Sequence, residues 1–214
     1  MALSPIILTY CSWSEFKKQE WDVAKRVIEL DAKPGVKLEQ LFELEFRKVQ
    51  TTEPLLCDLE KMVRFKVESA YRAVRVPCIV EHAGLVLDGY ESAFFPGGLT
   101  QPMWDALKAE RFVASCSPLT RQAIARAVVG YCDGMNIWTF VGETKGALSP
   151  KPRGKRAFYW DTVFCPEGFG DKTYAEIVDE GGLEKKLQVS QSIKALKKFM
   201  QHRLDNAPAL FPGL

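Results

Sequence analysis

The sequence has no long apolar run, no strong excess of charge of one sign and no paired-cysteine motif. No apolar run reaches the roughly 18 residues needed to span a bilayer. The start, MALSPIILTYCSW, lacks the basic front and small-residue cleavage pattern of a secretory signal, so we expect a cytoplasmic protein with no membrane partner. The 29 basic and 27 acidic residues leave a formal net charge of +2, which argues against general nucleic-acid binding.

The cysteines also argue against some classes of protein. Six are scattered through the chain, with mostly apolar neighbours and no C-x-x-C spacing, at positions 11, 57, 78, 116, 132 and 165. This pattern favours buried thiols over disulfides or a zinc site. With 47% hydrophobic residues among 214, the chain can bury a large core, which excludes a disordered or fibrous protein. We expect one domain over residues 1–214, with two closely packed lobes.

Strand and helix signals follow one another from the start of the chain, which indicates an α/β fold. A helix is predicted after the N-cap candidates Ser12 and Ser14, and Asp133-Gly134 is a hairpin signal. Glu81 and His82 follow a predicted strand, and strand ends are where α/β proteins gather functional side chains. The periodicities predict further helices over 55–75, 102–109 and 190–204, and strands over 6–9, 42–46, 78–80, 123–131, 136–144 and 158–164.

The segment from Gly142 to Glu176 combines small, basic, aromatic and acidic residues that no simple packing rule demands. Its aromatic residues Phe158, Tyr159 and Trp160 stand directly before Asp161, so a base could stack on a ring while the carboxylate accepts from its edge. Arg153 supplies a guanidinium suited to phosphate. These residues predict a nucleotide pocket. A platform for single-stranded nucleic acid, formed by the same aromatic residues with Lys151, Arg153, Lys155 and Arg156, is the less favoured reading.

Several segments resemble the inosine triphosphate pyrophosphatases, which hydrolyse non-standard purine nucleoside triphosphates. The matching segments, in chain order, are VPCIVEHAGLVLDG, FFPGG, GYCDG, FVGETKGAL, PRG, FYWD, FCPEGF, KTYAE and SIKALKKF. The resemblance implies an α/β protein with a long mixed twisted β-sheet and flanking helices, which form two lobes around a central cleft. It also implies a homodimer that converts a nucleoside triphosphate to monophosphate and pyrophosphate with Mg²⁺, or with Mn²⁺ in its place.

The resemblance assigns roles to particular residues. Glu53 and Glu81 would hold the metal, with Glu45 as an alternative to Glu53, and the catalytic pair would be Glu81 and His82. The residues implied to bind substrate are Thr9, Lys17, Arg153, Phe158, Tyr159, Trp160, Asp161, Lys186, Ser190 and Gln191.

Four positions depart from the family pattern. His82 stands where the family has an aspartate, and Tyr159 replaces a glycine. Thr9-Tyr10-Cys11-Ser12 replaces the phosphate-binding Thr-Gly-Asn, while Ser190-Gln191-Ser192 replaces Ser-His-Arg. Imidazole is a poor magnesium ligand but can act as a base near neutral pH.

These substitutions leave two hypotheses open. The chain is either a divergent pyrophosphatase acting on an altered nucleotide, with His82 or Glu81 as base, or a catalytically impaired relative that binds a nucleotide or a protein partner.

Overall fold

The structure, a computed structural model, describes residues 4–155 and 158–209. It is built around a seven-stranded mixed sheet with the order β2-β1-β3-β5-β6-β7, in which β4 also pairs with β3. β1 runs parallel to β2 and β3, whereas the remaining pairs are antiparallel. The strands are β1 (Ile6–Cys11), β2 (Phe42–Arg47), β3 (Cys78–Leu87), β4 (Pro96–Gly97), β5 (Gln122–Cys132), β6 (Ile137–Leu148) and β7 (Phe164–Pro166).

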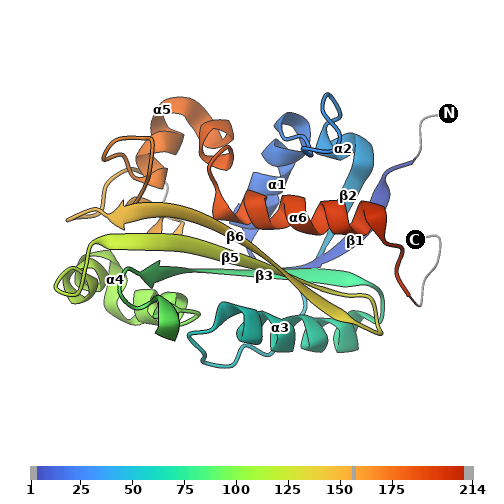
Figure 1. The fold of residues 1–214 in the computed structure, drawn as a ribbon, viewed down its shortest axis with the longest axis horizontal. Coiled ribbons are helices and arrows are strands. Elements are labelled where there is room, and N and C mark those ends of the chain that lie inside the picture. The colour runs from blue at the N-terminus through green and yellow to red at the C-terminus, as the bar shows by residue number, and fades with distance from the viewer. Residues whose placement is uncertain (1–3, 156–157, 210–214) are drawn as a thin grey trace.

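Helices cover both faces of the sheet, with α6 along one face and α3 along the other (Figure 1). Successive side chains of a strand point to opposite faces, so Ile79 of β3 packs in the cluster of Phe199 on α6, and Val80 packs with Val63 on α3. The expected α/β fold with a mixed sheet is confirmed. The helical elements are α1 (Glu15–Val27), α2 (Leu38–Leu41), α3 (Leu59–Val74), η1 (Glu91–Ala93), α4 (Thr100–Cys116), η2 (Tyr159–Thr162), α5 (Tyr174–Leu187) and α6 (Gln191–Asp205).

Side-chain hydrogen bonds explain where α1 and α3 begin. Ser14 caps α1, because its hydroxyl accepts a hydrogen bond from the backbone nitrogen of Lys17 at 3.3 Å. Asp58 caps α3 by accepting from the backbone nitrogens of Glu60 and Lys61 at 3.0 and 3.1 Å. The helix predicted over 55–75 therefore exists, but it begins at Leu59, directly after its cap and four residues later than the periodicity suggested.

Other sequence expectations are confirmed or corrected by the observed elements. The hairpin is confirmed, since Asp133 accepts from the backbone nitrogens of its turn and joins β5 to β6. The strand predicted over 158–164 is wrong, because these residues form η2 and only the first residue of β7. The helix predicted over 102–109 continues to Cys116 after a break at Lys108. α5, which has a capping box on Thr173, was not predicted over its length.

The placement of Glu81 and His82 at a strand end is also wrong, because β3 continues to Leu87. β1 pairs with β3 only as far as Ile79, and β4 joins the same strand only at Leu85. Among the described residues, the stretch of β3 between these two partners has an edge without a neighbouring strand. Glu81 and His82 therefore lie in the middle of β3, but beside an open edge that side chains from other elements can reach.

The described cysteines are free, and all except Cys57 are buried. In the part of the chain that the structure describes, no helix has both the length and the apolar character needed to cross a membrane.

Candidate active site

A cleft of about 640 Å³ lies at the open edge of β3. Its walls come from the end of β1, α1, the segment that precedes α3, β3, α4, η2 and the start of α6, together with Lys66 of α3 and Lys186 of α5. Of the site residues predicted from the sequence, those that line this cleft are Lys17, Glu53, Glu81, His82, Phe158, Tyr159, Trp160, Asp161, Lys186 and Gln191.

Glu81 is buried and held by hydrogen bonds on both carboxylate oxygens. Tyr10 donates to Oε2 at 2.8 Å, and Ser192 donates to Oε1 at 2.7 Å. Burial by itself raises the pKa of Glu81, but the nearby ammonium of Lys17 and the two hydroxyl donors outweigh it and bring the pKa below its ordinary value. Glu81 is therefore ionised at neutral pH, and its carboxylate is fixed in position.

Two lysines from opposite faces of the sheet meet at the main chain of Glu81. Lys17 of α1 and Lys66 of α3 donate to the carbonyl oxygen of Glu81 at 2.8 and 3.2 Å. This carbonyl is accessible to both because it lies on the open edge of β3. Burial lowers the pKa of Lys17, although Glu81 opposes that effect, and Lys66 lowers it further by repulsion. Two ammonium groups held this close together form a site that favours an anion with several charges.

His82 forms a pair with Glu53 on the α3 side of β3. Its Nδ1 is 3.4 Å from Oε2 of Glu53, whose other oxygen is 2.8 Å from the ammonium of Lys66. The contact with His82 and the charge of Lys66 lower the pKa of Glu53, so this carboxylate is ionised. Burial lowers the pKa of His82 below its ordinary value despite the opposing effect of Glu53, so the ring is neutral at pH 7.

The other ring nitrogen of His82, Nε2, is buried and has no hydrogen-bond partner among the described residues. A buried polar atom without a partner is uncommon in folded proteins and requires an explanation. With Nδ1 facing an ionised carboxylate, the neutral ring keeps its hydrogen on Nδ1 and leaves a lone pair on Nε2. His82 is therefore prepared to accept a proton or a hydrogen bond from a molecule in the cleft.

A buried ion network lies at the other end of the cleft. The ammonium of Lys186 is 2.8 Å from Glu20 and 2.6 Å from Asp161. Burial alone lowers the pKa of Lys186, but these two acids outweigh it and raise the pKa above its ordinary value. Lys186 is thus charged and can present a donor to a ligand.

The aromatic residues differ in how much of their surface faces the cleft. Phe158 stacks on Phe16 with ring centroids 4.6 Å apart and an interplanar angle of 17°. Trp160 is buried and meets Phe164 edge to face, so most of its ring belongs to the core. Tyr159 is half-buried, and its hydroxyl accepts a hydrogen bond from Nε2 of Gln101 at 3.0 Å. The predicted aromatic platform is therefore already partly covered by side chains of this chain.

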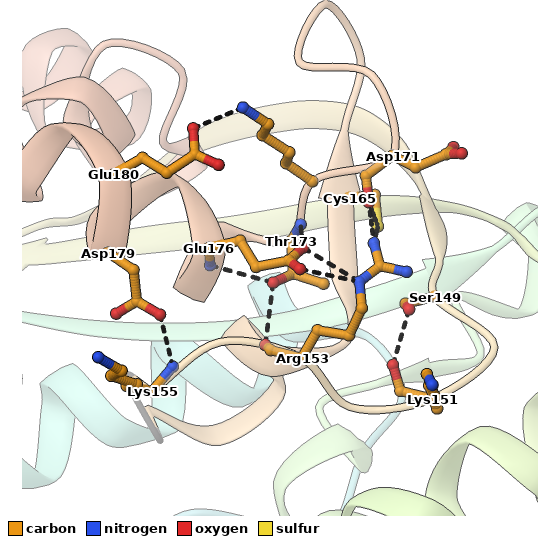
Figure 2. A network of polar contacts seen from close by, with 11 residues as sticks. Ser149, Lys151, Arg153, Lys155, Cys165, Asp171, Thr173, Glu176, Asp179 and Glu180 are labelled. Carbon is orange, nitrogen blue, oxygen red and sulfur yellow. Dashed lines mark hydrogen bonds and ion pairs between the residues drawn. The ribbon is translucent and has the colours of Figure 1, made fainter.

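Three predicted binding residues do not line the cleft. Thr9 is buried within β1, and Ser190 is buried at the N-cap of α6. Arg153 points into a network of its own, in which its Nε lies 3.1 Å from both carboxylate oxygens of Glu176 and its guanidinium also donates to the carbonyl of Asp171 (Figure 2). In this structure Arg153 holds the start of α5, and direct phosphate binding by it stays a prediction.

The same network bears on the reading as a platform for single-stranded nucleic acid. The backbone nitrogen of Lys155 donates to Asp179 at 2.8 Å, and the carbonyl of Lys151 accepts from Ser149 at 2.7 Å (Figure 2). These contacts tie the backbone of residues 151–155 to α5 and to Ser149, which directly follows β6. Arg156 lies outside the described residues.

Sequence reasoning missed several residues that build the cleft. Lys66 falls within the apolar stripe of the helix predicted over 55–75, and only the three-dimensional structure brings its ammonium to Glu81. The position of this lysine within an otherwise apolar stripe was the sequence signal that could have marked it as a site residue. Glu20 and Gln101 gave no such signal, because charged and polar residues are ordinary on helices. Tyr10 and Ser192, named from the sequence only within motifs that depart from the family, hold Glu81, and Phe16 stacks on Phe158.

These features define an α/β protein with a cleft that presents two ammonium groups, a carboxylate–imidazole pair and a partly aromatic far end. A sequence profile of the Ham1 family matches residues 8–202. The chain therefore belongs to the Ham1 family, which confirms the resemblance inferred from its motifs.

Curated relatives share about the same degree of identity with this chain. A dITP/XTP pyrophosphatase of Methanopyrus kandleri is 30% identical over 185 residues, covering 86% of this chain and 90% of that protein. The dITP/XTP pyrophosphatase of Saccharolobus solfataricus is 31% identical, covering 74% and 80%. Inosine triphosphate pyrophosphatase 2 of Trypanosoma cruzi is 30% identical, covering 65% and 69%.

Solved structures support the fold. The Ham1 protein of Staphylococcus aureus superposes with a TM-score of 0.65 at 18% identity, covering 93% of this chain and 98% of that one. A HAM1 protein from Coxiella burnetii gives the same TM-score at 16% identity, covering 94% and 100%.

Proposed function

We propose that this protein hydrolyses a non-standard or modified nucleoside triphosphate to the monophosphate and pyrophosphate. The observation that supports the proposal most strongly is the convergence of Lys17 and Lys66 at the open edge of β3, beside a neutral His82. A triphosphate carries the multiple negative charges that such a pair of ammonium groups favours. The names of the relatives, dITP/XTP pyrophosphatase and inosine triphosphate pyrophosphatase, point to the same class of reaction.

In the proposed mechanism, Lys17 and Lys66 hold the phosphate chain, and His82 acts as the general base. Nε2 of His82 takes a proton from a water molecule, whose oxygen forms a bond to the α-phosphorus. The bond from that phosphorus to the oxygen bridging the α- and β-phosphates breaks, and pyrophosphate leaves. Glu53 holds the imidazole ring and stabilises the positive charge that the ring gains, as the acid of a catalytic dyad does.

A divalent metal ion fits this cleft if the substrate shares in binding it. Mg²⁺ takes oxygen ligands and keeps several waters, so one or two carboxylates together with phosphates suffice. Glu53 and Glu81 are ionised and line the cleft, but each is already engaged by protein donors. Within the described residues, no three His, Cys, Asp or Glu side chains form a group that could hold a metal ion.

We therefore expect Glu53 and Glu81 to hold Mg²⁺ or Mn²⁺ only together with bound nucleotide. When bound, the ion would neutralise charge on the departing pyrophosphate.

The experiment that tests this function measures pyrophosphate release from a panel of standard, deaminated and modified nucleoside triphosphates, with Mg²⁺ or Mn²⁺. The expected result is turnover of at least one member, with a raised KM in Lys66→Gln and a much lower kcat in His82→Gln. Nucleotide binding without turnover of any member would reject the enzyme and favour the catalytically impaired relative, in which the same cleft binds a nucleotide. The homodimer stays a prediction, and light scattering of the purified chain would check it.

A further inference from the structure

Tyr159 has a backbone conformation that its side chain disfavours. Its φ of 44° lies in the left-handed region, which glycine enters freely and which bulky residues rarely adopt. Residues held in this way cluster at sites where the unusual geometry serves binding or catalysis. A glycine would adopt the same turn without strain. The presence of tyrosine at this position therefore suggests that its side chain has a role.

The side chain of Tyr159 connects two separate walls of the cleft. Its hydroxyl accepts the hydrogen bond from Gln101, which lies 58 positions earlier in the chain near the start of α4, whereas Tyr159 begins η2. Both residues line the cleft. Burial raises the pKa of the Tyr159 hydroxyl, and Asp105 raises it further, so the phenol is neutral and keeps its hydrogen for a second partner.

The other aromatic rings at this end already have neighbours. Phe158 stacks on Phe16, and the ammonium of Lys186 lies 5.3 Å from the centroid of the Phe158 ring. Trp160 is 6% exposed and packs in the core. The Tyr159 ring lies 5.5 Å from the Phe158 ring, centroid to centroid, so Tyr159 and Gln101 limit the space that remains for a base on their side of Phe158.

We propose that Tyr159, held in place by Gln101, is a specificity-determining residue that shortens the base end of the cleft and makes the protein prefer one-ring pyrimidine nucleoside triphosphates over two-ring purine ones. This inference rests on the proposed function and deepens it by naming the class of base. It separates this chain from relatives whose names specify dITP and XTP, both of which carry purine bases.

The test compares kcat/KM for dUTP and dCTP with kcat/KM for dITP and XTP in the wild-type protein and in Tyr159→Gly. We expect the wild type to favour the pyrimidine nucleotides by about tenfold or more. Tyr159→Gly should shift the ratio towards the purine nucleotides by about tenfold to a hundredfold, because it removes a ring that collides with the larger base. A general loss of folding or catalysis lowers all four values together, so the ratio reports specificity alone.

Two further variants separate the ring from its hydrogen bond. Tyr159→Phe keeps the ring and should move the ratio only a few-fold, as should Gln101→Ala, because each removes one neutral hydrogen bond. Phe94→Gly is the matched control, since Phe94 is also an aromatic residue at positive φ, 54°, but does not line the cleft. It should leave the ratio unchanged.

The proposal is overturned if the wild type prefers dITP or XTP, or if Tyr159→Gly leaves the ratio where it was. Absence of turnover on every nucleotide would instead count against the proposed function. In that case, dissociation constants for the same four nucleotides, measured by calorimetry on the wild type and Tyr159→Gly, test the same preference. An unchanged ratio of these constants would likewise overturn it.

Discussion

Replacing Lys186 by methionine should strongly destabilise the fold, because this lysine is a counter-charge to two buried acids. The side chain of Lys186 is 3% exposed, and those of Glu20 and Asp161 are 9% and 5% exposed. Removing one partner of a buried ion pair costs about 3–5 kcal/mol, since the remaining group stays out of water and loses that counter-charge. Methionine retains much of the apolar stem, so the expected loss of about 3 kcal/mol reports mainly on the charge.

The pH of the measurement matters for this variant. The pKa of Lys186 is raised above the ordinary lysine value near ~10.4, because Asp161 and Glu20 outweigh the effect of burial. A group with a raised pKa in the folded state stabilises fully below its unfolded pKa, and this stabilisation is lost as the pH rises through the folded value. Urea unfolding at pH 7 therefore measures the full contribution.

The assay compares the free energies of unfolding of the wild type, Lys186→Met and Lys172→Met. Lys172 pairs with Glu180 on the surface, where both side chains are about half exposed, at 47% and 49%. This control should lose at most about 1 kcal/mol. A loss below about 1 kcal/mol in Lys186→Met would refute the reasoning. If that variant does not fold, Lys186→Arg should still fold because it keeps the charge, and failure of both would show that shape rather than charge decides.

Three further predictions concern the cleft and its surroundings. His82→Gln should lower kcat by about 10²–10⁴. Burial lowers the pKa of His82, so wild-type kcat/KM should remain level as the pH is lowered past ~6.5 and should begin to fall only at a more acid pH. The same acid-side fall of kcat/KM in His82→Gln would contradict the assignment of His82 as the base. Lys66→Gln should raise KM about tenfold through loss of a charged contact to phosphate, whereas the exposed Lys61→Gln should match the wild type in steady-state assays. Arg153→Met should lower the free energy of unfolding by about 1 kcal/mol in urea titrations, and a large rise in KM would support the phosphate role predicted from the sequence, whereas an unchanged kcat/KM would reject it.

Much of the fold could be predicted from local signals. Sequence patterns predicted the helix that carries Val63 and Val67 and the hairpin at Asp133, because apolar periodicity and turn chemistry are properties of neighbouring residues. The prediction of a strand over 158–164 was wrong because it too relied on local pattern. A run of aromatic residues is typical of a strand, but Tyr159 adopts a left-handed backbone conformation that interrupts it. Backbone dihedral angles of that kind leave no mark in hydrophobic periodicity.

The candidate site could be predicted only in part. Glu81 and His82 were found from their place after a predicted strand, Asp161 from the aromatic residues before it and Lys186 through the family resemblance. The cleft does bring these residues together with Lys17. The sequence could not reveal the surroundings of the two ring nitrogens of His82, which depend on the segments that pack around it. Burial, the pairing with Glu53 and the unpartnered Nε2 arise from β3 extending past its neighbour β1, which is a property of strand pairing over long separations.

The family, the α/β class and ten of the residues that line the cleft could be predicted from the sequence, because motifs and periodicity are properties of short stretches of chain. The contacts between distant residues became visible only in the folded chain. Arg153 pairs with Glu176 outside the cleft lining, Lys66 reaches Glu81 from an apolar helix face, and Tyr159 is joined to Gln101 across the cleft. These outcomes depend on which distant segments pack together, since electrostatic and hydrogen-bonding partners are selected by proximity in space.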